Sequence, residues 1–150
     1  MSFSNDVKNE LSRLETNEVC CDKAEVLGVL RMSGAIVIRG MNIGIHFSTE
    51  NAALARRVLQ ILKNNYQVQT EVVITRSRRL KKNNRYQVRV LPAPQVSIAM
   101  NELQLLSMES DLKNPLLNKQ CCKRAFLRGA FLGGGSISRP SSDYHLEMVT

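Results

Sequence analysis

The chain has 150 residues, 43% of which are hydrophobic, and it carries a formal net charge of +8. This length suits about one domain with a sizeable core, and this hydrophobic content excludes a wholly disordered chain. The start of the chain lacks the apolar stretch of a secretory signal, and no apolar run approaches the roughly 18 residues of a membrane span. We therefore expect a cytoplasmic protein. Its charge favours a polyanionic partner, nucleic acid first, over a basic surface without a ligand.

The N-terminal half of the chain predicts helices and strands in succession. Apolar residues at helical spacing predict helices over about 4–17, 22–33 and 52–64, and alternating apolar residues predict strands over 35–38 and 43–48. In the third helix we expect four apolar side chains to point inward: Leu54, Val58, Ile61 and Leu62.

Two residues are typical of helix ends. Ser4 can act as the N-cap of the first helix by accepting a hydrogen bond from a free backbone N–H. Gly34 follows the second helix and is typical of a stop in the left-handed conformation. We therefore expect these two positions to mark helix boundaries.

The C-terminal half predicts a β-hairpin and then a return to the first pattern. The arms of the hairpin are predicted at 72–74 and 86–90, and we expect Pro92 and Pro94 to end the second strand. The elements that follow are a helix over about 95–106, a polar link over 107–119 and a new helix–strand–strand unit.

This return is an internal repeat. Segment 20–28 (CCDKAEVLG) recurs without a gap as segment 121–129 (CCKRAFLRG), an offset of 101 residues, since 121 minus 20 is 101. A long-period repeat indicates two copies of one supersecondary unit. The same offset relates Gly34 to Gly135, and Ile43, Ile45 and Phe47 to Tyr144, Leu146 and Met148. We predict an α+β fold with antiparallel hairpins, consisting of an N-terminal helix (1–19), a first repeat (20–119) and the start of a second (120–150).

Small residues recur on one face of the repeated helix. Ala24 and Gly28 in the first copy correspond to Ala125 and Gly129 in the second. Residues at positions i and i+4 share a helix face, and glycine inside a helix costs about 1 kcal/mol relative to alanine. We therefore predict that the two helices pack closely against each other about a pseudo-twofold axis.

The four cysteines occur as adjacent pairs, Cys20-Cys21 and Cys121-Cys122. Two adjacent residues rarely suit one zinc ion, whose usual ligand spacing is CxxC. We expect each pair to open a helix, with one thiol packed inward as a small apolar group, and zinc or a disulfide as the alternatives. No bound metal and no cofactor are predicted.

Basic residues are densest around the predicted hairpin. An antiparallel ribbon of this kind can enter a major groove or lie along phosphates, so we predict contact with double-stranded DNA. The alternative is that these charges protect a strand edge from pairing with other chains. The candidate DNA-binding residues are Arg76, Arg78, Arg79, Lys81, Lys82, Arg85 and Arg89. Other basic residues are interpreted as ordinary surface charge: Arg39, Arg56, Arg57, Lys123, Arg124, Arg128 and Arg139. We expect His46 and His145 to be strand residues rather than metal ligands.

The repeated helices resemble those of the LAGLIDADG homing endonucleases, with segments 26–34 and 127–135 at the positions of the nine-residue motif. The whole chain is similar to the WhiA family of bacterial regulators of sporulation and cell division. The residues that carry this resemblance are Met1-Ser2-Phe3-Ser4, the two cysteine pairs, 49–53 (TENAA), 78–84 (RRLKKNN) and 124–131 (RAFLRGAF). The resemblance implies a homing-endonuclease-like fold with one full αββαββα repeat and the beginning of another.

The resemblance also implies that catalysis has been lost. In the nucleases, each motif helix ends with an acidic residue, and the two acids hold a divalent metal for phosphodiester hydrolysis. The corresponding positions in this chain are Ser33 and Gly134, neither of which supplies a carboxylate. No catalytic residue is therefore predicted. The nearby acids are interpreted as solvated charges: Asp22, Glu25, Asp143 and Glu147.

Together these features predict a non-catalytic DNA-binding domain of a bacterial transcription regulator involved in sporulation and cell division, located in the cytoplasm with the nucleoid. The alternative is a degenerate nuclease domain that binds protein or ligand and modulates a C-terminal helix-turn-helix domain. The resemblance implies that this helix-turn-helix domain and the rest of the second repeat lie outside the chain. The predicted partners are double-stranded DNA and other regulatory proteins, with no membrane, and an open strand edge would favour self-association.

Overall fold

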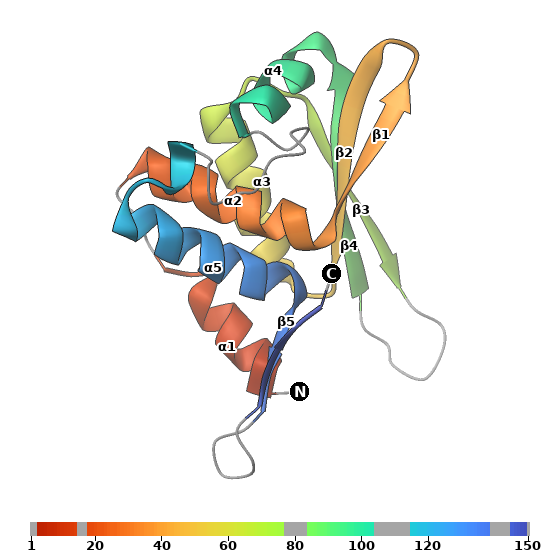
Figure 1. Cartoon of the computed structure of the whole chain (residues 1–150). Helices are drawn as coiled ribbons and strands as arrows, with labels where there is room; N and C mark the ends of the chain where they lie inside the picture. The colour runs from red at the N-terminus through yellow and green to blue at the C-terminus, as the bar shows by residue number, and fades with distance from the viewer. Residues whose placement is uncertain (1–2, 15–17, 77–83, 104–114, 139–144, 150) are drawn as a thin grey trace.

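The computed structural model describes residues 3–14, 18–76, 84–103, 115–138 and 145–149. Its element order is two helices, a hairpin, a helix, a second hairpin, a helix and a 3-10 turn, followed by a further helix and hairpin (Figure 1). The elements are α1 (Phe3–Leu11), α2 (Val19–Ser33), β1 (Gly34–Arg39), β2 (Asn42–Thr49), α3 (Ala52–Asn65), β3 (Thr70–Arg76), β4 (Asn84–Ala93), α4 (Pro94–Leu103), the 3-10 turn η2 (Pro115–Leu117), α5 (Gln120–Gly134), β5 (Gly135–Ile137) and β6 (Leu146–Met148).

The larger sheet has the strand order β1-β2-β4-β3, with every neighbouring pair antiparallel. Helices α3 and α4 pack against β2 and β4, and α2 contacts β1 and β2, so the helices cover one face of this sheet (Figure 1). Helix α5 lies beside α2 on the side away from α4, and it leads into the separate β5–β6 hairpin. This is the α+β fold predicted from the sequence.

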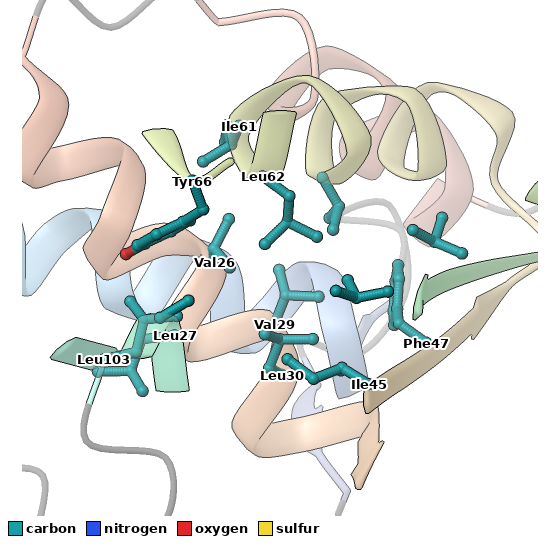
Figure 2. Packing of buried hydrophobic residues seen from close by; sticks show 14 of the residues in the cluster. Val26, Leu27, Val29, Leu30, Ile45, Phe47, Ile61, Leu62, Tyr66 and Leu103 are labelled. Carbon is teal, nitrogen blue, oxygen red and sulfur yellow. The ribbon is translucent and has the colours of Figure 1, made fainter. Parts of the chain in front are cut away.

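The main core lies between α2, α3, α4 and the covered face of the sheet. It forms because apolar residues recur at helical spacing in the helices and at every second position in β2 and β4. The four inward residues predicted for α3 are all buried. Figure 2 shows the side chains that meet at the centre of this core. They are Val26, Leu27, Val29 and Leu30 from α2, Ile45 and Phe47 from β2, Ile61 and Leu62 from α3, Tyr66 directly after α3, and Leu103 from α4.

The repeat holds in the strand pairing as well as in the sequence. In the first hairpin, Gly34 pairs with Phe47. In the second, Gly135 pairs with Met148, and each of these residues lies 101 positions after its counterpart. The next two pairs obey the same offset: Ala35–His46 and Ile36–Ile45 correspond to Ser136–Glu147 and Ile137–Leu146. The two copies therefore have the same register, which confirms the interpretation of the repeat.

Of the two residues predicted to mark helix ends, Gly34 does so directly after α2, whereas Ser4 acts differently. Ser4 lies inside α1, and its hydroxyl donates to the Ile137 carbonyl at 2.8 Å and accepts from the Ile137 N–H at 2.6 Å, so it joins α1 to β5 instead of capping the helix. Gly34 has φ −80°, which is not left-handed. Glycine is needed there because a Cβ would lie 2.7 Å from the Leu30 carbonyl oxygen.

Several helix and strand boundaries differ from those predicted. Helix α1 ends at Leu11, short of the predicted 17, and α2 begins before the predicted residue 22. Strand β4 continues through Pro92 to Ala93, which pairs with Ile43 of β2. The register shifts between Ile43 and Ile45, and a proline, which has no N–H, is tolerated at such an irregularity. Helix α4 is described only as far as Leu103, so residues 104–106 of the predicted helix lie outside the described residues.

Candidate functional site at the helix seam and the open sheet face

Helices α2 and α5 pack through the small residues that the repeat singled out. Ala24 and Ala125 are buried at this seam. A Cβ on Gly28 would lie 2.7 Å from the Ala130 nitrogen, and a Cβ on Gly129 would lie 2.8 Å from the Glu25 carbonyl carbon. Each glycine therefore faces the backbone of the opposite helix. The predicted close-packed helix pair is confirmed.

Neither C-terminal helix end carries a carboxylate at the motif position, and at Gly134 there is no space for one. The Ser33 hydroxyl donates to the Val29 carbonyl of its own helix at 3.1 Å. At Gly134, a Cβ would collide with the Val149 carbonyl oxygen and lie 2.9 Å from the Met32 side chain. Within the described ranges, the groups of His, Cys, Asp and Glu that could hold a cation are all built around the cysteine pairs, at the other end of the helices.

Glu25 was interpreted from the sequence as a solvated charge, and this is wrong. Its side chain is 2% exposed and forms ion pairs with Arg57 of α3 and Arg128 of α5. The Arg57 guanidinium also donates to the carbonyl of Ser12 at 3.0 Å and to that of Leu14 at 2.5 Å. Arg57 and Arg128, assigned to ordinary surface charge, are therefore part of a buried clamp that joins the end of α1 to α2, α3 and α5.

The sequence contains a weak indication of this clamp. Glu25 and Arg128 carry opposite charges within two repeated segments that are otherwise mostly apolar or small. Because buried charges are paired, opposite charges contributed by the two copies at a predicted seam indicate mutual pairing. The third member, Arg57, has no such signal, since its position depends on how α3 packs.

The face of the larger sheet opposite the helices carries part of the predicted DNA-binding set. Val88 and Val90 of β4 are buried beneath the helices, so Arg85 and Arg89, at alternate positions, lie on the opposite face. Arg76 pairs with Asn84, and its position in β3 shares the side of Val72 and Ile74 rather than that of Arg89. The structure therefore places Arg85 and Arg89 on the same face of the sheet and Arg76 on the other. Four others lie outside the described residues: Arg78, Arg79, Lys81 and Lys82.

Each of the two arginines on the open face forms an ion pair with an exposed carboxylate. The Arg89 guanidinium donates to Gln87 Oε1 at 2.5 Å and to Glu71 Oε1 at 3.4 Å. Arg85 lies 3.9 Å from Glu50, and both side chains are more than half exposed. Exposed ion pairs of this kind contribute about 0–1 kcal/mol, so a phosphate can replace these carboxylates at little cost.

His46 is a strand residue, as expected, whereas His145 lies just before a strand. His46 pairs with Ala35 and Arg89 within the larger sheet. His145 precedes β6, and its ring lies 3.4 Å from the Glu147 carboxylate, with both groups exposed. Glu147, predicted to be a solvated charge, is indeed on the surface, and Asp143 lies outside the described residues.

A paired-helix seam between two copies of a helix–hairpin unit defines a LAGLIDADG-type domain, in this case one without acids at the helix ends. Two family models match the sequence: the WhiA N-terminal LAGLIDADG-like domain over residues 19–106 and the WhiA LAGLIDADG-like domain over residues 123–150. The chain therefore belongs to the WhiA family.

Curated relatives agree with this assignment. The chain is 42% identical over its whole length to a probable cell division protein WhiA of Alkaliphilus metalliredigens, and 43% identical to one of Bacillus cytotoxicus. It spans about half the length of these relatives, covering 50% and 48% of them.

Two solved structures share the fold. Full-length WhiA from Thermatoga maritima superposes with a TM-score of 0.68 at 22% identity, covering 99% of this chain and 44% of that one. The N-terminal LAGLIDADG domain of WhiA superposes with a TM-score of 0.71 at 24% identity, covering 98% of this chain and 65% of that one. In the described part of this chain, none of the helices combines the length and hydropathy needed to cross a bilayer.

Proposed function

We propose that this chain is a non-catalytic DNA-binding part of a bacterial transcription regulator that acts in cell division and sporulation and works in the cytoplasm at the nucleoid. The family assignment and the names of the relatives support the link to cell division. The net charge of +8 and the arginines on the open sheet face support a nucleic-acid partner.

The observation that carries this proposal is a retained helix seam with altered helix ends. Hydrolysis of a phosphodiester in this fold needs carboxylates at the two helix ends to hold a hard divalent cation. Here the Ser33 hydroxyl is bonded within its own helix, and Gly134 is pressed against the Val149 backbone. The scaffold therefore supports binding without cleavage.

Charge reversal of the hairpin tests DNA binding. Changing Arg78, Arg79, Lys81 and Lys82 to Glu should weaken binding roughly uniformly across duplex sequences, because phosphate contacts carry little sequence information. The slope of log affinity against log salt should become shallower by up to about four, roughly one per lost phosphate contact. Fluorescence anisotropy with labelled duplexes over a salt series measures both quantities.

A matched control reverses the same number of charges on helix surfaces. Arg56, Lys63, Lys123 and Arg124 are all exposed, and changing them to Glu alters the net charge of the chain equally. We expect a smaller loss of affinity for this variant. Equal losses in both variants would show that only net charge matters and would reject the hairpin as the contact surface.

A plasmid-nicking assay tests the absence of catalysis. Incubation of supercoiled plasmid with the chain and Mg²⁺ or Mn²⁺ should yield no nicked product. The variant Ser33→Asp should remain inactive, because the partner position, Gly134, has no room for a second carboxylate. Reproducible nicking that is abolished by chelation would contradict the proposal.

A second candidate function is a protein-interaction module that regulates a helix-turn-helix domain. Exposed large apolar side chains on the strands favour it, namely Ile36, Ile38, Ile74, Leu146 and Met148. Apolar surface of this kind is typical of protein contacts, including self-association through β6. The two candidates separate at low salt, where a DNA-binding surface gives measurable duplex affinity and an interaction module gives none.

A further inference from the structure

The two cysteine pairs, far apart in sequence, meet at the N-terminal ends of α2 and α5. Both pairs lie in the first turn of their helix, and the helices cross at the seam just beyond them. Cys21 and Cys122 are buried, Cys20 is half-buried, Cys121 is exposed, and all four are free thiols. Each pair alone has a spacing that is poor for zinc, whereas the fold brings the two pairs into one cluster of four thiols.

The geometry of the cluster follows the pseudo-twofold axis. The Sγ atoms of Cys20, Cys21 and Cys122 all lie within 4.8 Å of one another. The Sγ atoms of Cys21 and Cys121 also lie within 4.8 Å of each other. The offset of 101 residues relates the Cys20–Cys122 contact to the Cys121–Cys21 contact, so these two contacts between the pairs follow the axis. Cys20 lies near both buried thiols, whereas Cys121 groups with Cys21.

We propose that these four cysteines bind one zinc ion at the pseudo-twofold axis and that the ion joins the N-terminal ends of α2 and α5. A site with four protein ligands is closed, so its role is structural rather than catalytic. Zinc would hold the two copies together at the end of the helices opposite Ser33 and Gly134.

The dimensions and chemistry of the cluster suit zinc. A tetrahedral site with Zn–S bonds of about 2.3 Å places its sulfurs about 3.8 Å apart. Cys20, Cys21 and Cys122 already lie within 4.8 Å of one another, so they need small side-chain adjustments, and the exposed Cys121 side chain has to turn toward them. Thiolates are soft ligands that select zinc over hard cations such as Mg²⁺. The positive ends of two helix dipoles also favour thiolates at this position.

The surroundings of the cluster are those of a structural site. The buried side chains of Ala24, Leu117 and Ala125 pack against Cys21 and Cys122 and exclude water from one side. On the other side, Cys20 Sγ lies 3.3 Å from a Glu18 carboxylate oxygen, and Lys119 lies 4.0 Å from the same oxygen. The lysine can offset part of the negative charge of a four-thiolate site.

A redox or nucleophilic role suits these thiols less well than metal binding. Burial, followed by the neighbouring thiols, raises the pKa of Cys21 to about 11 and raises the pKa of Cys122 further. The thiolate is the species that attacks disulfides and electrophiles, so two protonated thiols are poorly reactive. A bound cation reverses this balance, because it deprotonates the thiols that coordinate it.

The test is metal stoichiometry and coordination in the chain purified without a metal-binding tag. After dialysis against Zn²⁺ and then metal-free buffer with a reductant, we expect one zinc per chain by mass spectrometry of metals. Replacement with Co²⁺ should produce thiolate-to-cobalt charge-transfer absorption and the visible spectrum of a tetrahedral site. One zinc with such a spectrum supports the proposal, whereas no retained metal or an octahedral cobalt spectrum overturns it.

The variant Cys20→Ser/Cys121→Ser removes the two outer ligands without entering the buried core. We expect its zinc affinity to fall at least about 100-fold, since loss of an outer-shell partner alone costs about 10–100-fold. Its circular dichroism without zinc should match that of the unaltered chain, which separates ligand loss from misfolding. Unchanged affinity would overturn the proposal.

A matched control removes the other residues that commonly bind zinc. The variant His46→Ala/His145→Ala should keep one zinc with unchanged affinity, because neither histidine belongs to the cluster. Loss of zinc in this variant would assign the metal to histidine and overturn the cysteine site. Duplex binding by the hairpin does not depend on these outcomes, so the two proposals fail separately.

Discussion

Gly129→Ala should lower the free energy of unfolding by about 3 kcal/mol, the upper end for overpacking, even though alanine favours a helix by about 1 kcal/mol over glycine. The added Cβ would collide with the Glu25 carbonyl group on α2, and backbone cannot rotate away as a side chain can. For a chain of this size the melting temperature should fall by roughly 10 °C. Thermal and urea unfolding monitored by circular dichroism measure this change.

Two comparisons make this prediction specific to the seam. Arg124→Ala in the same helix changes an exposed side chain and should stay within about 0.5 kcal/mol of the unaltered chain. Gly129→Val should destabilise the chain more than Gly129→Ala, because the larger side chain forces the helices further apart. A stabilising effect of Gly129→Ala would show that the helices are not in backbone contact.

Glu25→Ala should lower the free energy of unfolding by about 3–5 kcal/mol, because it leaves the largely buried guanidinium groups of Arg57 and Arg128 without their shared carboxylate. This is a large part of the 5–15 kcal/mol that stabilises a typical domain. The control is Glu71→Ala, which removes an exposed partner of Arg89 and should cost about 0–1 kcal/mol. Urea unfolding of both variants gives the comparison.

A third variant separates the charge from the packing of the clamp. Replacing all three members together, as Glu25→Leu, Arg57→Met and Arg128→Met, removes the unpaired charge while keeping apolar volume. We expect it to recover most of the stability lost in Glu25→Ala, since well-packed apolar groups can replace a buried ion pair. Equal costs for Glu25→Ala and Glu71→Ala would show that Glu25 is not a buried member of an ion pair.

Much of the fold could be predicted because its signals are local or repeated. Alternation in β2 and β4 and helical spacing in α3 report which side of an element is buried, and these patterns need no knowledge of the partner. The offset of 101 residues relates Gly28 to Gly129. A single helix face of small residues would predict little, but its recurrence in the second copy predicts that the two helices pack against each other. The loss of acids at Ser33 and Gly134 follows from the resemblance to the LAGLIDADG nucleases, whose motif marks these two positions.

Helix ends were predicted less well, because glycine and serine have more than one use. Gly34 ends α2 as predicted, but without the left-handed conformation typical of such a glycine, and it is needed for close approach to Leu30. Ser4 was expected to cap α1, but it bonds to Ile137, which lies 133 residues away. Local sequence cannot distinguish a cap from a tertiary contact, because both use the same hydroxyl.

The sequence by itself determined the repeat, the α+β architecture, the small-residue seam and the absence of carboxylates where the nucleases carry them, because each depends on residue type at a fixed spacing. Only the tertiary structure decided that Glu25 is buried between two arginines, that Arg76 lies apart from Arg85 and Arg89, and that the cysteine pairs form one cluster. These outcomes depend on the rotation and approach of elements distant in the chain. The environment of a charge or a thiol is set by those neighbours and not by the residues beside it in sequence.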